Sequence, residues 1–285
     1  MIEGRPSDTA LQVAASRAAH LRFDPAPHLL DDIHAADLLG PEALALVDGY
    51  ANDGPWLLVE NRLFIPLRAR YVEDRLRDAH LRGIRQFIIL GAGLDSFIFR
   101  QPEDLTELRV FEIDHPSTQI WKRARIEDLG WTLPENGCYV PCDFEKERVS
   151  EVLEETDFDP NQPAIVSWMG VVYYLEKPTV DAALRDLASI LASGSEVVFD
   201  AMRPWDELPE RYEKVRSVMA QYLSGAGEPH INRYRREEII DAIRMAGYSE
   251  ALVEEREDVE RRYLTPLKTE IPLSHRFRLV VARVG

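Results

Sequence analysis

The stretch Gln86-Phe-Ile-Ile-Leu-Gly-Ala-Gly-Leu-Asp-Ser96 decides the fold of this chain. Its first half is a short apolar run without charges, which is typical of a strand covered on both faces in a parallel sheet. Gly91 and Gly93 then allow the chain to turn sharply and to bring its backbone against a ligand without a Cβ in the way. The stretch therefore predicts a buried strand followed by a ligand-binding turn.

A second strand with an acidic end follows at Val110-Phe-Glu-Ile-Asp114. Strand side chains alternate between the two faces, so Glu112 and Asp114 are expected on the same side. Two carboxylates would then lie at the carboxyl end of this strand. Open α/β sheets bind ribose-bearing cofactors at that end.

The glycine turn leaves several cofactor classes open. The dinucleotide fingerprint is Gly-x-Gly-x-x-Gly, and its third glycine position is occupied by Ser96 here, which weakens that interpretation. An adenosyl nucleoside needs less, since one glycine turn and one acid that accepts both ribose hydroxyls suffice. A glycine corner in an α/β domain of some other use is the third alternative.

Five separate pieces of the sequence resemble one known family. They are Gly4-Arg-Pro-Ser-Asp-Thr-Ala10, Arg68-Ala-Arg-Tyr-Val-Glu-Asp74, Leu90-Gly-Ala-Gly-Leu-Asp-Ser96, Phe111-Glu-Ile-Asp-His-Pro116 and Ser167-Trp-Met-Gly-Val-Val-Tyr-Tyr-Leu175. As a set they resemble the leucine carboxyl methyltransferase family of class I S-adenosylmethionine-dependent enzymes, especially its bacterial branch. That branch includes tetracenomycin-type polyketide O-methyltransferases, so the resemblance implies methyl transfer to oxygen, in secondary metabolism.

The resemblance also implies which residues bind the cofactor. Arg68 would hold the methionyl carboxylate of S-adenosylmethionine, and Asp114 would accept hydrogen bonds from the ribose hydroxyls. Asp143 and Phe144 would hold the adenine. The complete implied set is Arg68, Gly91, Ala92, Gly93, Asp114, Asp143, Phe144 and Trp168.

Some of these assignments have structural alternatives. Arg68 would also suit an ion pair on a helix surface, because Glu73 and Asp74 follow it closely. Asp143 and Phe144 would also suit a helix N-cap and its packing neighbour. In addition, many family members carry a glutamate where this chain has Met169, so one acidic contact to the cofactor's amino group is missing, and a backbone carbonyl could replace it.

The overall charge excludes some classes of partner. The chain has 285 residues, of which 45% are hydrophobic, and its formal net charge is −16, from 34 Lys+Arg against 50 Asp+Glu. We therefore expect neither a nucleic acid nor a membrane as partner. The sequence shows no transmembrane-length apolar run and no secretory signal pattern, which predicts a cytoplasmic protein. Cys138, Cys142 and seven scattered histidines form no ligand-spaced cluster, so we expect no metal site and no disulfide.

Alternating strand and helix patterns predict an α/β fold. We expect a doubly wound, mostly parallel sheet of seven strands, a class I methyltransferase or Rossmann-like architecture. The chain would form a single domain, 1–285. Its expected parts are an N-terminal helical cap (1–83), a cofactor-binding core (84–200), a lid insertion (201–232), and a C-terminal helix with two strands (233–285).

Apolar periodicity and helix-terminating residues place the individual elements. Expected strands are 86–91, 108–113, 137–141, 163–169, 196–200, 248–254 and 276–283. Expected helices are 8–22, capped by Ser7 or Asp8, then 61–82, one from about 95, one opened by Pro116, then 145–155, one ended by Gly194, and 234–246.

The nature of the methyl acceptor follows from what is missing. Methyl transfer from a sulfonium to a carboxylate needs no base, whereas a phenol or alcohol acceptor needs one, and no His or Asp is placed unambiguously for that task. A carboxylate is therefore favoured. Candidate acceptor-site residues are Arg5, Tyr173, Tyr174 and Arg203, with Tyr173 and Arg203 preferred as catalytic. Arg203 would alternatively pair with Asp206 or Glu207, and the lid aromatics Trp205, Tyr212 and Tyr222, with Met219, would line an apolar pocket or simply pack.

The sequence as a whole predicts an S-adenosylmethionine-dependent O-methyltransferase. Its acceptor would be a carboxylate of a small molecule, a polyketide or a peptide. Two alternatives remain, an NAD(P)-dependent oxidoreductase of Rossmann type and a non-catalytic cofactor-binding protein. The oligomeric state cannot be predicted from the sequence.

Overall fold

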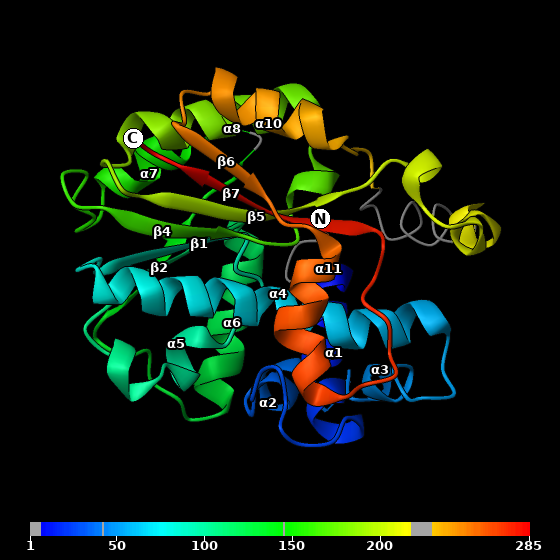
Figure 1. Cartoon of the computed structure of the whole chain (residues 1–285). Coiled ribbons are helices and arrows are strands. Elements are labelled where there is room, and N and C mark those ends of the chain that lie inside the picture. Colours follow the sequence, from blue (N-terminus) through cyan, green and yellow to red (C-terminus); the bar gives the residue numbers. More distant parts are fainter. Residues whose placement is uncertain (1–6, 42, 145, 218–229) are drawn as a thin grey trace.

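A computed structural model describes residues 7–41, 43–144, 146–217 and 230–285. Seven strands form one central sheet in the order β3-β2-β1-β4-β5-β7-β6 (Figure 1). Strand β7 runs antiparallel to both of its neighbours, and the pairings among β1 to β5 are parallel. The strands are β1 Gln86–Leu90, β2 Arg109–Asp114, β3 Gly137–Pro141, β4 Ala164–Trp168, β5 Glu196–Met202, β6 Glu250–Val253 and β7 Phe277–Arg283. The predicted doubly wound, mostly parallel sheet is confirmed.

Strand β1 lies in the middle of the sheet, as its uniformly apolar sequence predicts. All five of its residues are buried, and Ile88 pairs with Phe111 on one side and Val166 on the other. The carboxyl ends of β1, β2 and β4 therefore meet at one edge. The sheet order changes direction at β1, and open α/β sheets bind ligands at such a switch point.

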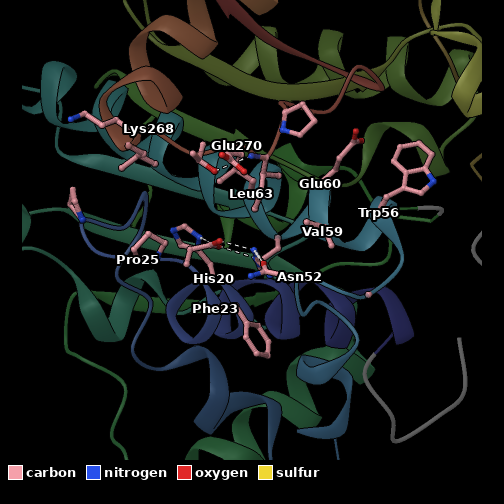
Figure 2. A pocket seen from close by; sticks show the side chains of 18 of the residues that line it. His20, Phe23, Pro25, Asn52, Trp56, Val59, Glu60, Leu63, Lys268 and Glu270 are labelled. Carbon is pink, nitrogen blue, oxygen red and sulfur yellow. Dashed lines mark hydrogen bonds and ion pairs between the residues drawn. The ribbon is translucent and has the colours of Figure 1, made fainter.

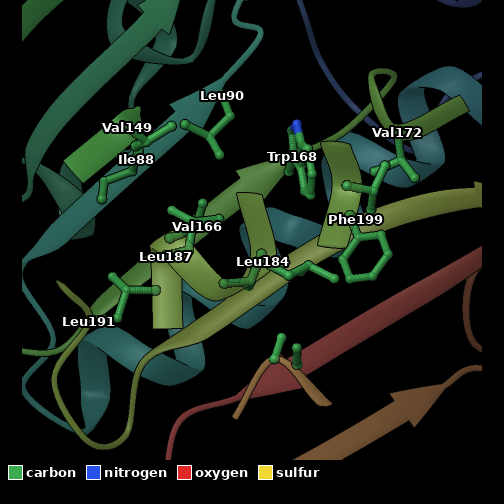
Figure 3. Packing of buried hydrophobic residues seen from close by; sticks show 14 of the residues in the cluster. Ile88, Leu90, Val149, Val166, Trp168, Val172, Leu184, Leu187, Leu191 and Phe199 are labelled. Atoms are coloured by element: carbon green, nitrogen blue, oxygen red, sulfur yellow. The ribbon is translucent and has the colours of Figure 1, made fainter. Parts of the chain in front are cut away.

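Helices α7 Val149–Glu154, α8 Lys177–Ile190 and α10 Arg236–Met245 cover one face of the sheet (Figure 1). Their apolar side chains meet those of the strands in a continuous core (Figure 3). Val180, Leu184 and Leu187 recur at helical spacing on α8 and are all fully buried. Because large apolar residues supply most of the folding free energy, this layer fixes the strands whose ends form the site.

The other face is covered mainly by the long helix α4 Trp56–Leu81, with α5 Phe97–Arg100 and α6 Pro116–Asp128 beside it (Figure 1). The predicted helix 61–82 is confirmed, but it begins five residues earlier, directly after Pro55. Conversely, the helix expected from about 95 is only one turn long. Gln101 precedes Pro102, and a residue before proline disfavours the helical conformation, so α5 ends there.

Helix α1 packs against α4, and two short helices pack against α1. Helix α1 Asp8–Phe23 is capped by Ser7, whose side chain accepts a hydrogen bond from Ala10 N at 3.0 Å, as predicted. Helices α2 Ala35–Leu39 and α3 Ala45–Asp48 were not predicted from the sequence. They are short, and at four or five residues their apolar periodicity cannot be recognised.

The segment after β5 has little regular structure within its described residues. Single helical turns cover Trp205–Glu207 and Glu210–Tyr212, and residues 218–229 of the predicted lid lie outside the described part of the chain. Near the C-terminus, α11 Arg256–Val259 continues into a wider helical turn, Glu260–Leu264. Cys138 and Cys142 are both free thiols. Within the described ranges, no helix combines the length and apolarity that crossing a bilayer requires.

Candidate functional site

A cavity of about 570 Å³ opens at the carboxyl ends of β1, β2 and β4. It is bounded by the glycine turn, by the start of α1, by one face of α4 and by the segment that follows β4. Residues named from the sequence form much of its lining, namely Arg68, Gly91, Ala92, Gly93, Asp114, Asp143, Phe144, Tyr173 and Tyr174. Folding therefore brings together residues that are up to 106 positions apart, Arg68 to Tyr174.

The glycine turn presents backbone rather than side chain to this cavity. Gly91 and Gly93 have φ angles of 66° and 51°, which residues with a Cβ rarely adopt. A Cβ on Gly91 would lie only 2.4 Å from Cγ2 of Val171, which follows β4. The turn is fixed to β2, because the N–H groups of Gly91 and Ala92 both donate to the carbonyl oxygen of Ile113, at 2.8 and 3.2 Å.

Asp114 lies at the acidic end of β2 and lines the cavity. Its Oδ2 accepts a hydrogen bond from Gly93 N at 2.5 Å, and its Oδ1 accepts one from His115 N at 2.6 Å. Burial raises the pKa of this carboxyl group, while the two backbone N–H groups oppose the rise. Each oxygen keeps a further lone pair, which suits the two hydroxyls of a ribose.

Glu112 and Asp114 both lie at the carboxyl end of β2, as predicted, but only Asp114 lines the cavity. The Glu112 side chain is buried and forms an ion pair with Lys122 Nζ on α6. Lys122 Nζ also donates to the carbonyl oxygen of Asp95, at 2.6 Å. Burial raises the pKa of Glu112 to about 7 despite the nearby lysine. The pair therefore ties β2 to the chain that follows the glycine turn.

Arg68 reaches the cavity from α4 and is held by two partners. Its Nη1 donates to Asp200 Oδ2 at 2.9 Å and to the Tyr173 hydroxyl at 3.1 Å. The Oδ1 atom of Asp200 accepts a hydrogen bond from Gly170 N at 2.6 Å. One buried acid therefore fixes both the arginine and the loop after β4. Burial disfavours the charge of Arg68, but Asp200 and Tyr173 together outweigh this effect and raise the arginine's pKa. The alternative of a helix-surface ion pair with Glu73 or Asp74 is thereby wrong.

Asp143 and Phe144 lie at the far end of the same cavity, directly after β3. Asp143 Oδ2 is 2.6 Å from Lys146 Nζ, and the Asp143 N–H donates to Glu147 Oε2 at 2.8 Å. The Phe144 ring packs against the edge of the core. A carboxylate beside an apolar ring suits an adenine, whose amino group is a donor and whose faces are apolar.

Two sequence-predicted site residues lie elsewhere. Trp168 is 2% exposed and packs in the core against Phe199, with ring centroids 6.1 Å apart, while its neighbours Ser167 and Met169 line the cavity (Figure 3). Its position on β4 directs its side chain to the core face, because strand side chains alternate. Arg203 borders a separate small cavity and lies 3.6 Å from Glu207, so the ion-pair alternative describes it correctly.

The lid candidates are only partly described. Arg5, Met219 and Tyr222 lie outside the described residues. Tyr212 is buried and donates its hydroxyl to Glu60 Oε2 at 2.7 Å, away from the cofactor-sized cavity. The Trp205 ring is covered by the Arg233 guanidinium at 4.0 Å. For these two aromatics packing is therefore the better interpretation.

The structure adds two residues that sequence reasoning did not assign to the site. Asp200 was seen only as the end of a strand, although an acid at a strand's carboxyl end is the same signal that identified Asp114. His230 packs its ring on Tyr173 and Tyr174, with centroid distances of 4.8 and 5.0 Å. No sequence signal identifies His230, because the contact joins positions that are 56 or 57 residues apart.

A second cavity of about 760 Å³ lies between the end of α1, the first turns of α4 and the segment 267–272 (Figure 2). Glu60 and Leu63 of α4 face it, whereas Ile65 and Arg68 face the first cavity. The two cavities therefore meet different faces of one helix. Over the described ranges, no group of three or more His, Cys, Asp or Glu side chains is arranged to hold a metal ion.

Comparison with known sequences identifies related proteins. The profile of the leucine carboxyl methyltransferase family matches residues 10–188. A Bacillus subtilis protein named "Putative S-adenosyl-L-methionine-dependent methyltransferase" is 33% identical over 221 residues, which cover 70% of this chain and 72% of that protein. A protein of the same name from Mycobacteroides abscessus is 30% identical over 224 residues, covering 78% of this chain and 73% of its own length.

Solved structures support the same fold. A structure described as a putative methyltransferase from Thermobifida fusca superposes with a TM-score of 0.60 at 19% identity, covering 99% of this chain and 96% of that one. A DUF574 family protein from Streptomyces avermitilis gives a TM-score of 0.59 at 14% identity, with 99% of each chain covered. At these identities the likeness concerns the fold alone.

Proposed function

We propose that this chain, which belongs to the leucine carboxyl methyltransferase family, transfers a methyl group to a carboxylate oxygen of its acceptor. The chain is an S-adenosylmethionine-dependent methyltransferase. The acceptor is the new part of the proposal. A small molecule, a polyketide or a peptide could each present the carboxylate.

The residues of the cavity fit the cofactor. Gly91 and Gly93 line the cavity without a side chain, and the Asp114 carboxylate lines it from the end of β2. Arg68 uses Nη1 for its protein partners, and we propose that its Nη2 edge binds the methionyl carboxylate. Asp143 and Phe144 would then border the adenine. The amino group of the cofactor would bind a backbone carbonyl near Met169, because the family glutamate is absent there.

The observation that carries the acceptor assignment is the chemistry of the cavity wall after β4. When bound, the cofactor supplies a methyl group on a positively charged sulfur, and a carboxylate attacks it in line as the carbon–sulfur bond breaks. Tyr173 and Tyr174 border this wall, and burial raises the pKa of Tyr173 to about 12, so it stays a neutral hydroxyl. A neutral phenol orients an acceptor and removes no proton.

His230 does not supply the missing base. Burial, together with the charges of Arg276 and Arg233, lowers the pKa of His230 to about 3, so the imidazole holds a proton poorly. A general base works best when its pKa lies near the working pH. A carboxylate acceptor, which needs no deprotonation at neutral pH, therefore fits this wall better than a phenol or an alcohol.

Product chemistry tests the proposal. The purified protein would be incubated with methyl-labelled S-adenosylmethionine and an extract of small acids, and the labelled product treated with mild alkali. A methyl ester is cleaved and releases labelled methanol, whereas a methyl ether or methylamine survives. Label that survives alkali would overturn the carboxylate assignment. Titration with S-adenosylhomocysteine and NADH in parallel separates this function from the oxidoreductase alternative, since only the former should bind.

A further inference from the structure

Two arginines behind the Tyr173 wall, the buried Arg276 and the half-buried Arg233, form no ion pair within the described part of the chain. Arg276 is 3% exposed, and its hydrogen bonds go to neutral groups, Ser274 Oγ at 3.2 Å and Asn61 Oδ1. Arg233 donates to the carbonyl oxygen of Arg203 at 2.7 Å. Within the described ranges, neither guanidinium has a carboxylate within ion-pair distance.

This arrangement is unexpected in an acidic chain. The sequence has 50 Asp and Glu residues for 34 Lys and Arg, so carboxylate partners are abundant. Glu60 influences Arg276 electrostatically, but its two oxygens are bonded to Arg211 and Tyr212, each at 2.7 Å. Burying an arginine without a paired anion costs free energy, and a bound anion would supply the missing partner.

The two arginines lie close to the wall of the cofactor cavity. Arg276 stacks on Phe277 at 4.9 Å, and the Phe277 ring centroid is 5.8 Å from that of Tyr173. His230 packs its ring on Tyr173 and is influenced electrostatically by both arginines, and the N–H of Ile231 donates to the carbonyl oxygen of Tyr173 at 2.9 Å. Tyr173 itself lines the cavity. The charges are thus one layer behind the surface that an acceptor would meet.

The pKa shifts of Arg233, Arg276 and His230 agree with a positive charge here that no nearby anion balances. Burial and the charge of Arg276 lower the pKa of Arg233 to about 10, and burial also lowers that of Arg276. The same two charges contribute to the low pKa of His230. An anion placed here would relieve all three groups, since opposite charges favour each other's charged forms.

We propose that Arg233 and Arg276 make the Tyr173 end of the cavity, against which His230 packs, a binding site for the anionic head of the methyl acceptor. The head is a carboxylate, and this inference rests on the proposed function. The arginines attract and position it through His230 and Tyr173 and do not touch the reacting atoms. They are positioning residues, and the pair takes the role that the sequence assigned to Arg203.

The test uses acetate, the smallest carboxylate, and acetamide, its neutral counterpart. The protein saturated with S-adenosylhomocysteine would be titrated with each at constant ionic strength, while the ring resonances of His230 are followed by NMR. Acetate should give a saturable shift and raise the pKa of His230, and acetamide should give neither. No saturable response to acetate, or an equal response to acetamide, would overturn the inference.

Variants assign the effect to the two arginines. Arg233→Gln and Arg276→Met should each weaken acetate binding by about five- to tenfold, because each removes one charge at short range. Arg261→Gln is the matched control, since it removes an exposed charge that pairs with Asp258 at 2.6 Å, and it should change nothing. Equal acetate affinity in all variants would contradict the proposal. If Arg276→Met does not fold, Arg233→Gln still decides.

The same samples separate this inference from the proposed function. S-Adenosylhomocysteine affinity should stay within twofold in both arginine variants, because neither residue lines the cofactor cavity. If S-adenosylhomocysteine does not bind to the unmodified protein, the proposed function itself fails. If it binds and acetate does not, only the anionic-head site fails.

Discussion

Asp200 binds Arg68 with one carboxylate oxygen, at 2.9 Å from Nη1, and binds Gly170 N with the other, at 2.6 Å. The first contact joins β5 to α4 and the second joins β5 to the loop after β4. Asp200 is fully buried, so both contacts are shielded from water. One acid thus sets the orientation of the proposed carboxylate-binding arginine relative to the tyrosines of the acceptor wall.

Arg68→Ala is expected to weaken S-adenosylhomocysteine binding by about 1.5–3 kcal/mol, because a charge-assisted hydrogen bond to the methionyl carboxylate is lost. 5′-Methylthioadenosine lacks that carboxylate and should lose much less. Isothermal titration calorimetry with both ligands measures the difference.

The control for this variant concerns the buried partner. Removing Arg68 leaves Asp200 unpaired, which costs about 3–5 kcal/mol of stability when a buried ion pair is broken. The double variant Arg68→Ala with Asp200→Asn removes both charges and should melt at a higher temperature than the single variant. If the double variant loses the same affinity for both ligands, Arg68 has a structural role only.

Asp114→Asn keeps the shape of the side chain but removes the charge and one of the two acceptor oxygens. Gly93 N and His115 N now each donate to one oxygen of Asp114, and an amide can accept only one of these bonds. Binding of S-adenosylmethionine should fall by about 1.5–3 kcal/mol. Unchanged affinity would remove Asp114 from the ribose site.

Gly91→Ala tests the close approach of the glycine turn to the loop after β4. The new Cβ would overlap Val171, and the φ angle of 66° adds backbone strain of roughly 1 kcal/mol. We expect a clear loss of thermal stability and of cofactor binding. Gly91→Ala combined with Val171→Ala should recover the part due to overlap, whereas the strain remains. A double variant as unstable as Gly91→Ala would show that Val171 is not the obstacle.

The fold should lose stability on mild acidification because of His230. Its pKa falls from 6.5 to about 3 on folding, through burial and then through Arg276 and Arg233. Below pH 6.5 the unfolded chain therefore binds a proton that the folded chain does not, and stability decreases as the pH falls toward 3.

His230→Gln removes this proton linkage. Between pH 7.5 and pH 5 the unmodified protein should lose about 2 kcal/mol more unfolding free energy than the variant. This value follows because pH 5 lies about 1.5 units below the pKa of histidine in the unfolded chain. Tyr173 also faces this ring, but burial raises its pKa to about 12, so it stays neutral over that range and does not obscure the comparison. Urea unfolding at the two pH values measures it, and parallel losses in both proteins would contradict the prediction.

The sequence predicted the sheet and the cofactor end of the site because their signals are local. The apolar run 86–90, the glycines that follow it and Asp114 all lie within 29 residues, and the structure brings them to one cavity. Alternation alone put Glu112 on the same side of β2 as Asp114. It could not show that Lys122 would bind that side chain under α6.

The acceptor end was predicted less well because its contacts are long-range. Arg203 was chosen for its place after β5, but Glu207, four residues on, binds it. Arg276 and His230 lie far along the chain from Tyr173 and carry no motif. The carboxylate acceptor, the cytoplasmic location, the absence of nucleic-acid and membrane partners and the division of the chain into a cap, a core and a lid remain predictions.

The state of the two native cysteines makes the chain convenient for spectroscopy. Burial, together with neighbouring carboxylates, raises the pKa of Cys142 to about 12, and burial also raises that of Cys138. Maleimide dyes react with the thiolate, which both residues hardly form at neutral pH. A cysteine introduced at the exposed Glu210 position, as Glu210→Cys, would therefore take up the dye almost alone. Its fluorescence would report directly on the segment after β5 as ligands are added.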